Sequence, residues 1–202
     1  MEKNKSYSSA IEIFKKNSGI LRMSEAMKQG IPQYMIYSLL SEGVLIREER
    51  GLYRLNTKFQ FSNPDLIYIS LLVPKAVICL TSALYFYQLT TQIPSAINIA
   101  LPKNIRLPKI DYPPIDVVWL SSKVYSAGID EQVLDGIMIK IYSPEKTITD
   151  CFKFRSKIGH DIAIEALKDY MQKYPPKINE LMEYARVNRV EKLMRPYLET
   201  LI

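Results

Sequence analysis

The order of elements predicted in the first sixty or so residues constrains the fold most strongly. Three segments have the composition of short helices, "SYSSAIEIFKKNSG", "MSEAMKQG" and "IPQYMIYSLLSEG", and each ends at a glycine. A hairpin follows, with "VLI" and "LYRL" as strands and "EERG" as the turn. This order predicts a winged helix-turn-helix, in which the second helix of the pair enters the major groove of DNA.

The helix predicted over 32–42 has two unlike faces. At 100° per residue, Ile36, Leu39 and Leu40 share one face, whereas tyrosine and serine share the opposite one. Surface helices usually carry Lys and Glu, but this polar face is uncharged, and its hydroxyl and amide groups can donate to and accept from base edges. The residues predicted to contact bases are Gln33, Tyr34, Tyr37 and Ser38.

The hairpin would form the wing, and its arginines would contact phosphates. Gly51 permits a tight tip, and the residues predicted to contact the DNA backbone are Arg22, Arg47, Arg50 and Arg54. Two alternatives stay open. Similar helix and hairpin modules serve protein interaction alone, and exposed arginines are often merely solvated; Glu48 and Glu49 also argue mildly against phosphate contact.

Charge and composition fit a nucleic-acid partner without requiring one. The net charge is +6, and residues 1–56 hold 9 Lys/Arg against 6 Asp/Glu, so the basic bias is denser at the N-terminus. No stretch has the length and apolar character of a membrane span or signal peptide, which predicts a cytoplasmic protein with no membrane partner. Cys79 and Cys151 lack the CxxC or histidine companions of a zinc site, so no metal is expected.

A polar break, "NTKFQFSNPDL", predicts a domain boundary, with a winged helix-turn-helix at 1–58 and a second domain at 62–202. A helix is expected from Pro64, and another in "TSALYFYQL" with Thr81 as its cap. Strands are expected in "AVICL", "AINIALP", "IDVVWL" and "GIMIKIYS". Helices are then expected at roughly 144–156, 160–173, 178–187 and 189–201. The fold class is therefore α+β, with a mixed small sheet followed by a C-terminal helical bundle.

Basic residues recur in two places in the second domain. They suggest a surface that faces RNA or DNA and assists the winged helix, although solvated helix faces explain them more simply. The steps of three between Arg186, Arg189, Lys192 and Arg195 would place these four on a slanting helical stripe. The residues assigned to this surface are Lys146, Lys153, Arg155, Lys157, Arg186 and Arg189.

The sequence holds no recognisable catalytic motif. The single histidine, His160, lacks a Gly-x-Ser-x-Gly elbow, and no P-loop, GxGxxG or HExxH occurs. Glu145 and Asp150 beside Lys146 are better explained by an ordinary helix start, with Ser143 as N-cap, than by acid–base chemistry. No enzymatic activity and no cofactor are expected, and an enzyme whose site escapes these patterns stays an alternative.

Several of these residues resemble the AbiEi-type antitoxins of type IV toxin–antitoxin systems. The N-terminal similarity lies in Gly19, Gly30, Tyr37-Ser38-Leu39, Gly43-Val44-Leu45 and Gly51-Leu52-Tyr53-Arg54-Leu55. The C-terminal similarity lies in Pro144, Glu145, Lys146, Thr147, Asp150, Gly159, Asp161, Glu165, Ala166 and Leu167. The pairing of the two blocks is more specific than the wing pattern alone.

This resemblance implies an autorepressing antitoxin used in phage defence. The N-terminal domain would bind inverted repeats in double-stranded promoter DNA. The second domain would counteract a co-encoded nucleotidyltransferase toxin without needing a stable complex. The alternative from another class is a winged-helix regulator whose second domain serves protein interaction or ligand sensing and is unrelated to toxins.

Overall fold

The computed structural model describes residues 2–58 and 60–201. Its contacts divide the chain into two compact units. The first comprises residues 1–74 with 108–113 and 133–139, and the second comprises 75–107, 114–132 and 140–202. The predicted assignment of separate functions to domains at 1–58 and 62–202 stays a prediction.

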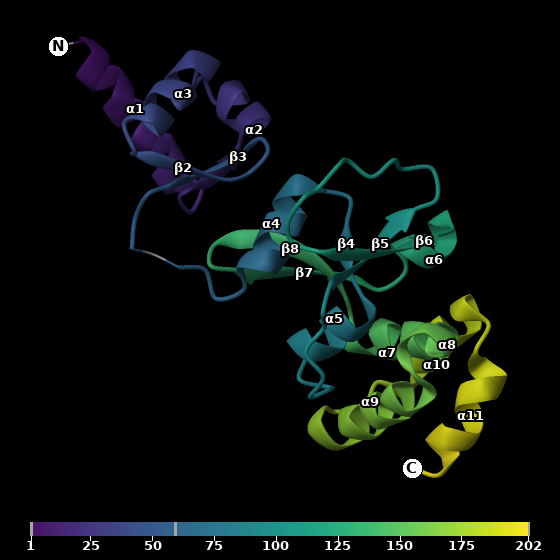
Figure 1. Ribbon diagram of the computed structural model, residues 1–202. Coiled ribbons are helices and arrows are strands. Elements are labelled where there is room, and N and C mark those ends of the chain that lie inside the picture. Colours follow the sequence, from purple (N-terminus) through teal and green to yellow (C-terminus); the bar gives the residue numbers. More distant parts are fainter. Residues whose placement is uncertain (1, 59, 202) are drawn as a thin grey trace. The chain divides into compact units, whose positions relative to one another are not determined.

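The first unit contains a winged helix-turn-helix (Figure 1). Helix α1 (Glu2–Lys16) precedes strand β1 (Ile20–Arg22), and α2 (Met23–Lys28) and α3 (Gln33–Ser41) form the helix-turn-helix pair. Strands β2 (Leu45–Glu49) and β3 (Leu52–Leu55) form the wing. The three strands form an antiparallel sheet in the order β1-β3-β2.

One face of this small sheet packs against the three helices. Phe14 of α1, Ala26 of α2 and Ile36 and Leu39 of α3 are fully buried in a cluster that also contains Tyr53 of the wing. Full burial of an Ile, Leu or Phe side chain stabilises a fold by about 1.5–3 kcal/mol. The apolar stripe of α3 is therefore held inward, and its opposite face must point outward.

Helix α4 (Pro64–Leu72) belongs to the second apolar cluster of the first unit. This cluster combines Ile20 and Leu52 of the small sheet with Ile67 and Tyr68 of α4, and with Ile137. Pro64 stands in the first turn of α4, as predicted, and Asn63 is its N-cap. The small sheet thus has apolar residues on both faces.

A five-stranded mixed sheet follows, in the order β6-β5-β4-β8-β7. Strand β4 (Val77–Ile78) pairs antiparallel with β5 (Ile97–Pro102) and parallel with β8 (Ile137–Tyr142). Strand β6 (Ile115–Leu120) pairs parallel with β5. Strand β7 (Ile129–Leu134) joins β8 through Asp135 and Gly136, whose φ angles of 50° and 80° suit a two-residue hairpin turn.

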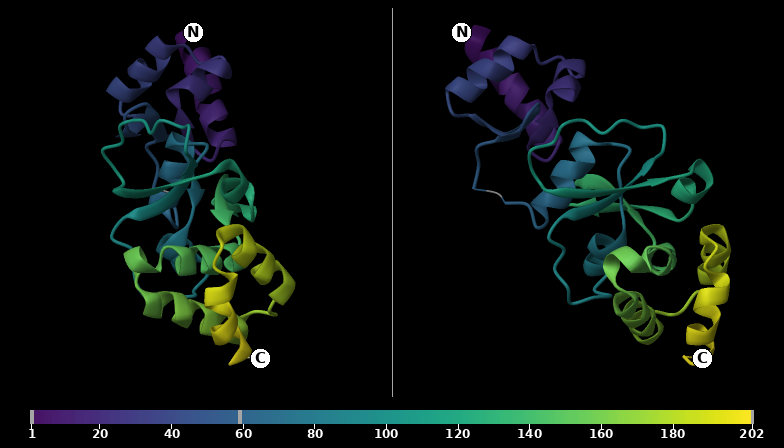
Figure 2. Two further views of the ribbon diagram at one scale, coloured as in Figure 1. Left: turned by 90° about the vertical axis from the view of Figure 1, so that its right-hand side faces the viewer. Right: turned by 45° about the vertical axis from the view of Figure 1, so that its right-hand side comes forward.

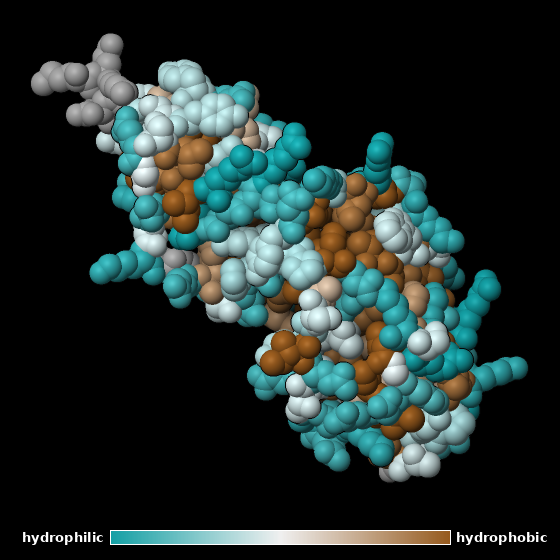
Figure 3. Space-filling model, viewed as in Figure 1, coloured by the Kyte–Doolittle hydropathy of each residue, from teal (hydrophilic) through white to brown (hydrophobic). Residues whose placement is uncertain are grey.

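Helices of the second unit gather on one side of this sheet (Figures 1 and 2). They are α5 (Leu80–Phe86), α7 (Pro144–Lys153), α9 (His160–Lys173), α10 (Ile178–Asn188) and α11 (Glu191–Glu199), while α6 (Ser122–Ser126) and α8 (Arg155–Ile158) are short. Their shared core includes Ile148, Phe152 and Leu167, all completely buried. In Figure 3, apolar residues also show at the surface around β4 and β5.

The predicted fold class, α+β with an N-terminal winged helix-turn-helix, a small mixed sheet and C-terminal helices, is confirmed. Ser143 caps α7, as predicted, because its hydroxyl accepts from the Lys146 backbone N–H at 3.2 Å. The prediction that Thr81 caps a helix is wrong, because α5 begins at Leu80 and its N-cap is Cys79.

Candidate nucleic-acid interface

A short turn fixes the angle between α2 and α3. Gly30 adopts a φ of +91°, which glycine reaches without the strain of a Cβ atom. The N–H of Gly30 donates to Met27 O and that of Ile31 to Ala26 O, each at 3.0 Å, so the end of α2 is closed by backbone hydrogen bonds. Ile31 is buried, and α3 starts at Gln33 with its axis held by this anchor.

The outward face of α3 is aromatic and uncharged. Tyr34 is 70% exposed and Tyr37 is 49% exposed, whereas Ile36 and Leu39 are completely buried. The Gln33 amide donates to the Tyr37 hydroxyl at 3.0 Å, one helical turn away. Over α3 the molecular surface is pale, the colour of intermediate hydropathy (Figure 3). Burying such a face against base edges costs less desolvation than burying Lys or Glu.

Ser38, the fourth predicted base contact, has a partner within the protein. Its hydroxyl shares a short hydrogen bond with the hydroxyl of Tyr7 on α1, and Tyr7 also donates to the Glu42 carboxylate at 2.9 Å. These bonds hold α1 against the C-terminal half of α3. Tyr7 was not predicted in this positioning role, because nothing in the local sequence pattern pairs it with Ser38.

Arg47 lies on the same face of the wing as Tyr53. The two residues are register partners in the β2–β3 ladder, and Arg47 is exposed. Burial raises the pKa of Tyr53, the nearby Tyr37 raises it further, and Arg47 lowers it. Arg47 and Tyr37 therefore both lie near Tyr53. Arg50 is also exposed, at the turn before Gly51, whose φ is +78°.

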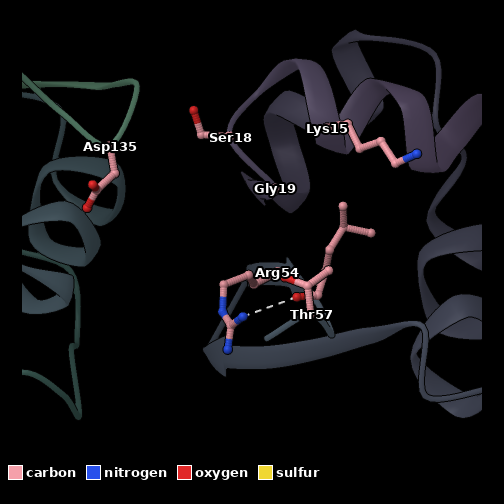
Figure 4. Close-up of a pocket in the computed structure, with 7 residues that line it drawn as sticks. Lys15, Ser18, Gly19, Arg54, Thr57 and Asp135 are labelled. Carbon is pink, nitrogen blue, oxygen red and sulfur yellow. Dashed lines mark hydrogen bonds between the residues drawn. The ribbon is translucent and has the colours of Figure 1, made fainter. Parts of the chain in front are cut away.

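Arg54 faces the other way. It is the register partner of Ile20 and Ile46, on the sheet face that contributes Ile20 and Leu52 to the α4 cluster. Its guanidinium lies 2.5 Å from the Glu48 carboxylate, with both side chains less than a fifth exposed. It also donates to the Leu55 carbonyl at 3.2 Å (Figure 4). Arg22 pairs with Leu52 in the ladder and therefore shares this face.

The two wing glutamates are engaged inside the first unit. Glu48 interacts with Arg54 and also with the Tyr68 hydroxyl of α4. Burial is the main cause that raises the pKa of Tyr68 to about 12, and the charge of Glu48 raises it further. Glu49 accepts from the backbone N–H groups of Arg50 and Tyr112, at 2.7 and 3.1 Å. Arg54 therefore offsets the charge of Glu48, whereas backbone N–H groups hold the Glu49 carboxylate in place.

A small pocket of about 310 Å³ lies beside Arg54 (Figure 4). In Figure 4, the Lys15 amine points away from Ser18 and Asp135, and the lining groups do not converge on one point. Lys15 is paired with Glu12 at 2.9 Å. The pocket has no arrangement of acid, base and nucleophile. Its lining residues are Lys15, Ser18, Gly19, Arg54, Leu55, Thr57 and Asp135.

The residues of the predicted basic surface in the second domain differ in burial and in their partners. Lys146 is wrong as a surface residue: it is completely buried, and its amine lies 2.6 Å from Asp150. Lys157 pairs with Asp116 at 2.6 Å, and Arg155 donates to the Phe152 carbonyl at 3.0 Å. Lys153, Arg186 and Arg189 line one pocket.

The predicted slanting stripe of cations is also wrong. Helix α10 ends at Asn188, Arg189 adopts the left-handed conformation, and α11 begins at Glu191. The four basic residues of this region therefore do not lie along one helix, because α10 ends and α11 begins between them.

The single histidine packs against aromatic rings, and the two cysteines are buried in the core. The His160 ring packs edge-on against Phe152 and Tyr197. Cys79 and Cys151 are buried, and burial raises the pKa of both thiols. Among residues 2–58 and 60–201, no group of three His, Cys, Asp or Glu side chains could hold a metal ion. Within the same ranges, no helix combines the length and hydropathy needed to cross a membrane.

Comparison with known proteins supports the N-terminal assignment. A family model described as "Transcriptional regulator, AbiEi antitoxin" matches residues 9–56, which span α1 to the end of the wing. This agrees with the resemblance seen in the sequence. It supports a DNA-binding antitoxin function, and it covers the part of the chain that contains α3 and the wing.

A solved structure is similar over most of the chain. It is the crystal structure of the RV2827C protein from Mycobacterium tuberculosis, with a TM-score of 0.54 and 14% sequence identity. The similarity covers 96% of this chain and 81% of that chain. At this identity the likeness concerns the fold alone. A search of curated protein sequences gave no match.

Proposed function

We propose that this protein is a DNA-binding antitoxin that represses its own operon and counteracts a co-encoded nucleotidyltransferase toxin. Helix α3 would enter the major groove of promoter inverted repeats, with Gln33, Tyr34 and Tyr37 against base edges. Arg47 and Arg50 would contact the flanking phosphates. The observation that carries the proposal is the exposed, uncharged Tyr34–Tyr37 face of α3, together with the exposed Arg47 and Arg50 of the wing.

This arrangement divides recognition into two physical tasks. Phosphate contacts from arginine supply affinity that depends on salt but not on sequence. Amide and phenol groups supply hydrogen bonds and apolar contacts whose geometry depends on the base pair. Because the apolar side of α3 is fully buried, the helix cannot rotate to present another face. Its side chains would therefore reach the groove in a fixed register.

The repressor part of the proposal is tested by fluorescence anisotropy with duplexes from the gene's own promoter. Tyr34→Ala and Gln33→Ala should each weaken binding to the preferred duplex by about 1–3 kcal/mol, and should reduce discrimination at one base pair. The matched control is Tyr85→Ala, which removes a tyrosine of the second unit that is 45% exposed. If the control and the α3 variants bind with equal affinity, α3 does not read the bases.

A winged-helix regulator with a ligand-sensing second domain is the alternative function. One observation favours it, the polar pocket of about 710 Å³ in the second unit. The two functions differ in one measurement. A regulator unrelated to toxins would bind promoter DNA but would not restore the growth of cells expressing the neighbouring nucleotidyltransferase gene.

A further inference from the structure

The pocket of about 710 Å³ in the second unit is unusually rich in cations. It is formed by α6, the end of α7 and the C-terminal half of α10. Four basic side chains face a single acidic one. The lining residues are Ser121, Lys123, Val124, Lys153, Glu183, Arg186, Val187, Asn188 and Arg189.

Most of this positive charge is not neutralised within the protein. In the part of the chain that the structure describes, Lys123, Lys153 and Arg189 form no ion pair, and Arg186 reaches Glu191 only at 3.6 Å. Burial lowers the pKa of Lys153, and Lys146, Arg189 and Lys103 lower it further, while Asp150 opposes them. Asp150 is already paired with Lys146. The pocket therefore attracts anions.

Asn188 adds a second kind of recognition group. It is only 3% exposed, and its amide nitrogen donates to Thr149 at 2.9 Å and to Asp150 at 2.7 Å. These bonds fix the orientation of the amide. Its Oδ1 atom receives no hydrogen bond within residues 2–58 and 60–201. A buried carbonyl without a donor is rare in native proteins, and a water molecule or a group of a bound ligand would satisfy it.

Arg189 occupies this site in a strained conformation. Its φ of +60° and ψ of 35° are left-handed values, which glycine or asparagine adopts at helix ends far more readily than arginine does. The fold thus places a cation at a position where glycine would be more stable. Strain of this kind is typical of binding sites.

We propose that this pocket binds the phosphates of a nucleotide. Lys123, Lys153, Arg186 and Arg189 contact the phosphoryl oxygens, and a hydroxyl or amino group of the same ligand donates to Asn188 Oδ1. The volume falls in the range of small-molecule sites. The phosphates can belong to a free nucleotide or to the phosphorylated end of an RNA strand, because both present the same chemistry.

The test is isothermal titration calorimetry of the full chain with ATP, tripolyphosphate and adenosine at low salt. ATP should bind most tightly, tripolyphosphate more weakly because it lacks a donor for Asn188, and adenosine not measurably. Arg189→Gly should weaken ATP binding about tenfold or more, as expected for loss of a charged hydrogen bond. Glycine suits the left-handed backbone, so this variant should fold. Lys153→Gln provides an independent second variant.

The matched control is Lys192→Ala, which removes an exposed cation of α11 that does not line the pocket. Its ATP affinity should stay within about twofold of the parent. An RNA tetranucleotide with a 5′-phosphate, compared with its 5′-hydroxyl form, distinguishes the two sources. Equal ligand affinity in Arg189→Gly, Lys153→Gln and Lys192→Ala would overturn the proposal, as would absence of binding by both ATP and the 5′-phosphorylated RNA. Promoter binding by Arg189→Gly tests the repressor function separately.

Discussion

Arg47 and Arg54 lie on adjacent strands of one hairpin, yet their surroundings differ. Arg47 is exposed on the sheet face that carries Tyr53, and Arg54 is mostly buried against Glu48 on the opposite sheet face. From the sequence, all four arginines of this region were predicted to contact the DNA backbone. Alternation along a strand shows that neighbours face opposite ways, but it does not identify which face a later helix will cover. Helix α4 covers the face that carries Arg54, and this packing depends on residues distant in sequence.

This difference gives a prediction for individual residues. Arg47→Ala should weaken DNA binding and make the slope of log K against log salt shallower by about 0.9, the value for one phosphate contact. Arg54→Ala should leave the slope unchanged, and should instead lower the free energy of unfolding by about 1–3 kcal/mol because Glu48 loses its partner. Anisotropy titrations over a range of KCl concentrations, together with urea unfolding, measure both quantities.

The opposite pattern would contradict the assignment of the wing faces. A shallower salt slope in Arg54→Ala, with none in Arg47→Ala, would mean that DNA displaces Glu48 from Arg54. Lys192→Ala serves again as the control for a general change of net charge.

Helix α7 shows how a sequence motif can mislead at the scale of an element. Its Pro-Glu-Lys-Thr start suggests an exposed, charged first turn, but residues 145–152 are all buried. Lys146 contacts both Asp150 oxygens at 2.6 Å and lies 4.2 Å from the centre of the Tyr142 ring. Asn188 of α10 donates to the same Asp150. The hydrogen bond from Asn188 therefore joins α10 to the ion pair of α7 inside the core.

Breaking this pair should destabilise the second unit strongly. Asp150→Ala leaves the Lys146 ammonium buried without a counter-charge, and the expected loss is about 3–5 kcal/mol. The double variant Lys146→Met/Asp150→Leu should be less destabilised than Asp150→Ala, because it removes both charges. Urea unfolding followed by circular dichroism gives the two free energies. A loss below about 1 kcal/mol for Asp150→Ala would show that water reaches the pair.

Gly128 supports the same arrangement from the sheet side. Its φ is +69°, and an added Cβ atom would lie 2.6 Å from the Cβ of Lys146. The start of strand β7 is thus packed tightly against α7. Strand β7 itself was not predicted, although Asp135-Gly136 is a strong hairpin signal. Its sequence gives little alternation to predict a strand, because the charged Glu131 shares one face with Ile129 and Val133.

At the scale of the whole molecule, promoter binding and toxin antagonism are expected to separate. The full chain with Tyr34→Ala and Arg47→Ala should lose repression of a promoter fusion, because both changes lie at the proposed DNA surface. It should still protect cells that express the neighbouring nucleotidyltransferase gene. Reporter activity and growth, with immunoblots to confirm equal protein levels, measure the two outcomes. Simultaneous loss of both activities would assign the antitoxin function to the winged helix.

The sequence by itself determined the α+β class, the winged helix-turn-helix and the two faces of α3. These features depend on periodicity, glycine positions and turn residues, which act between neighbours along the chain. Tertiary structure alone decided that Arg54 pairs with Glu48, that Ser38 bonds to Tyr7, and that Lys146 is buried. It also brought Lys123 of α6 to the same pocket as Arg189. The physical reason is that the partners of a charged or polar side chain are set by contacts distant in sequence, and periodicity carries no information about them.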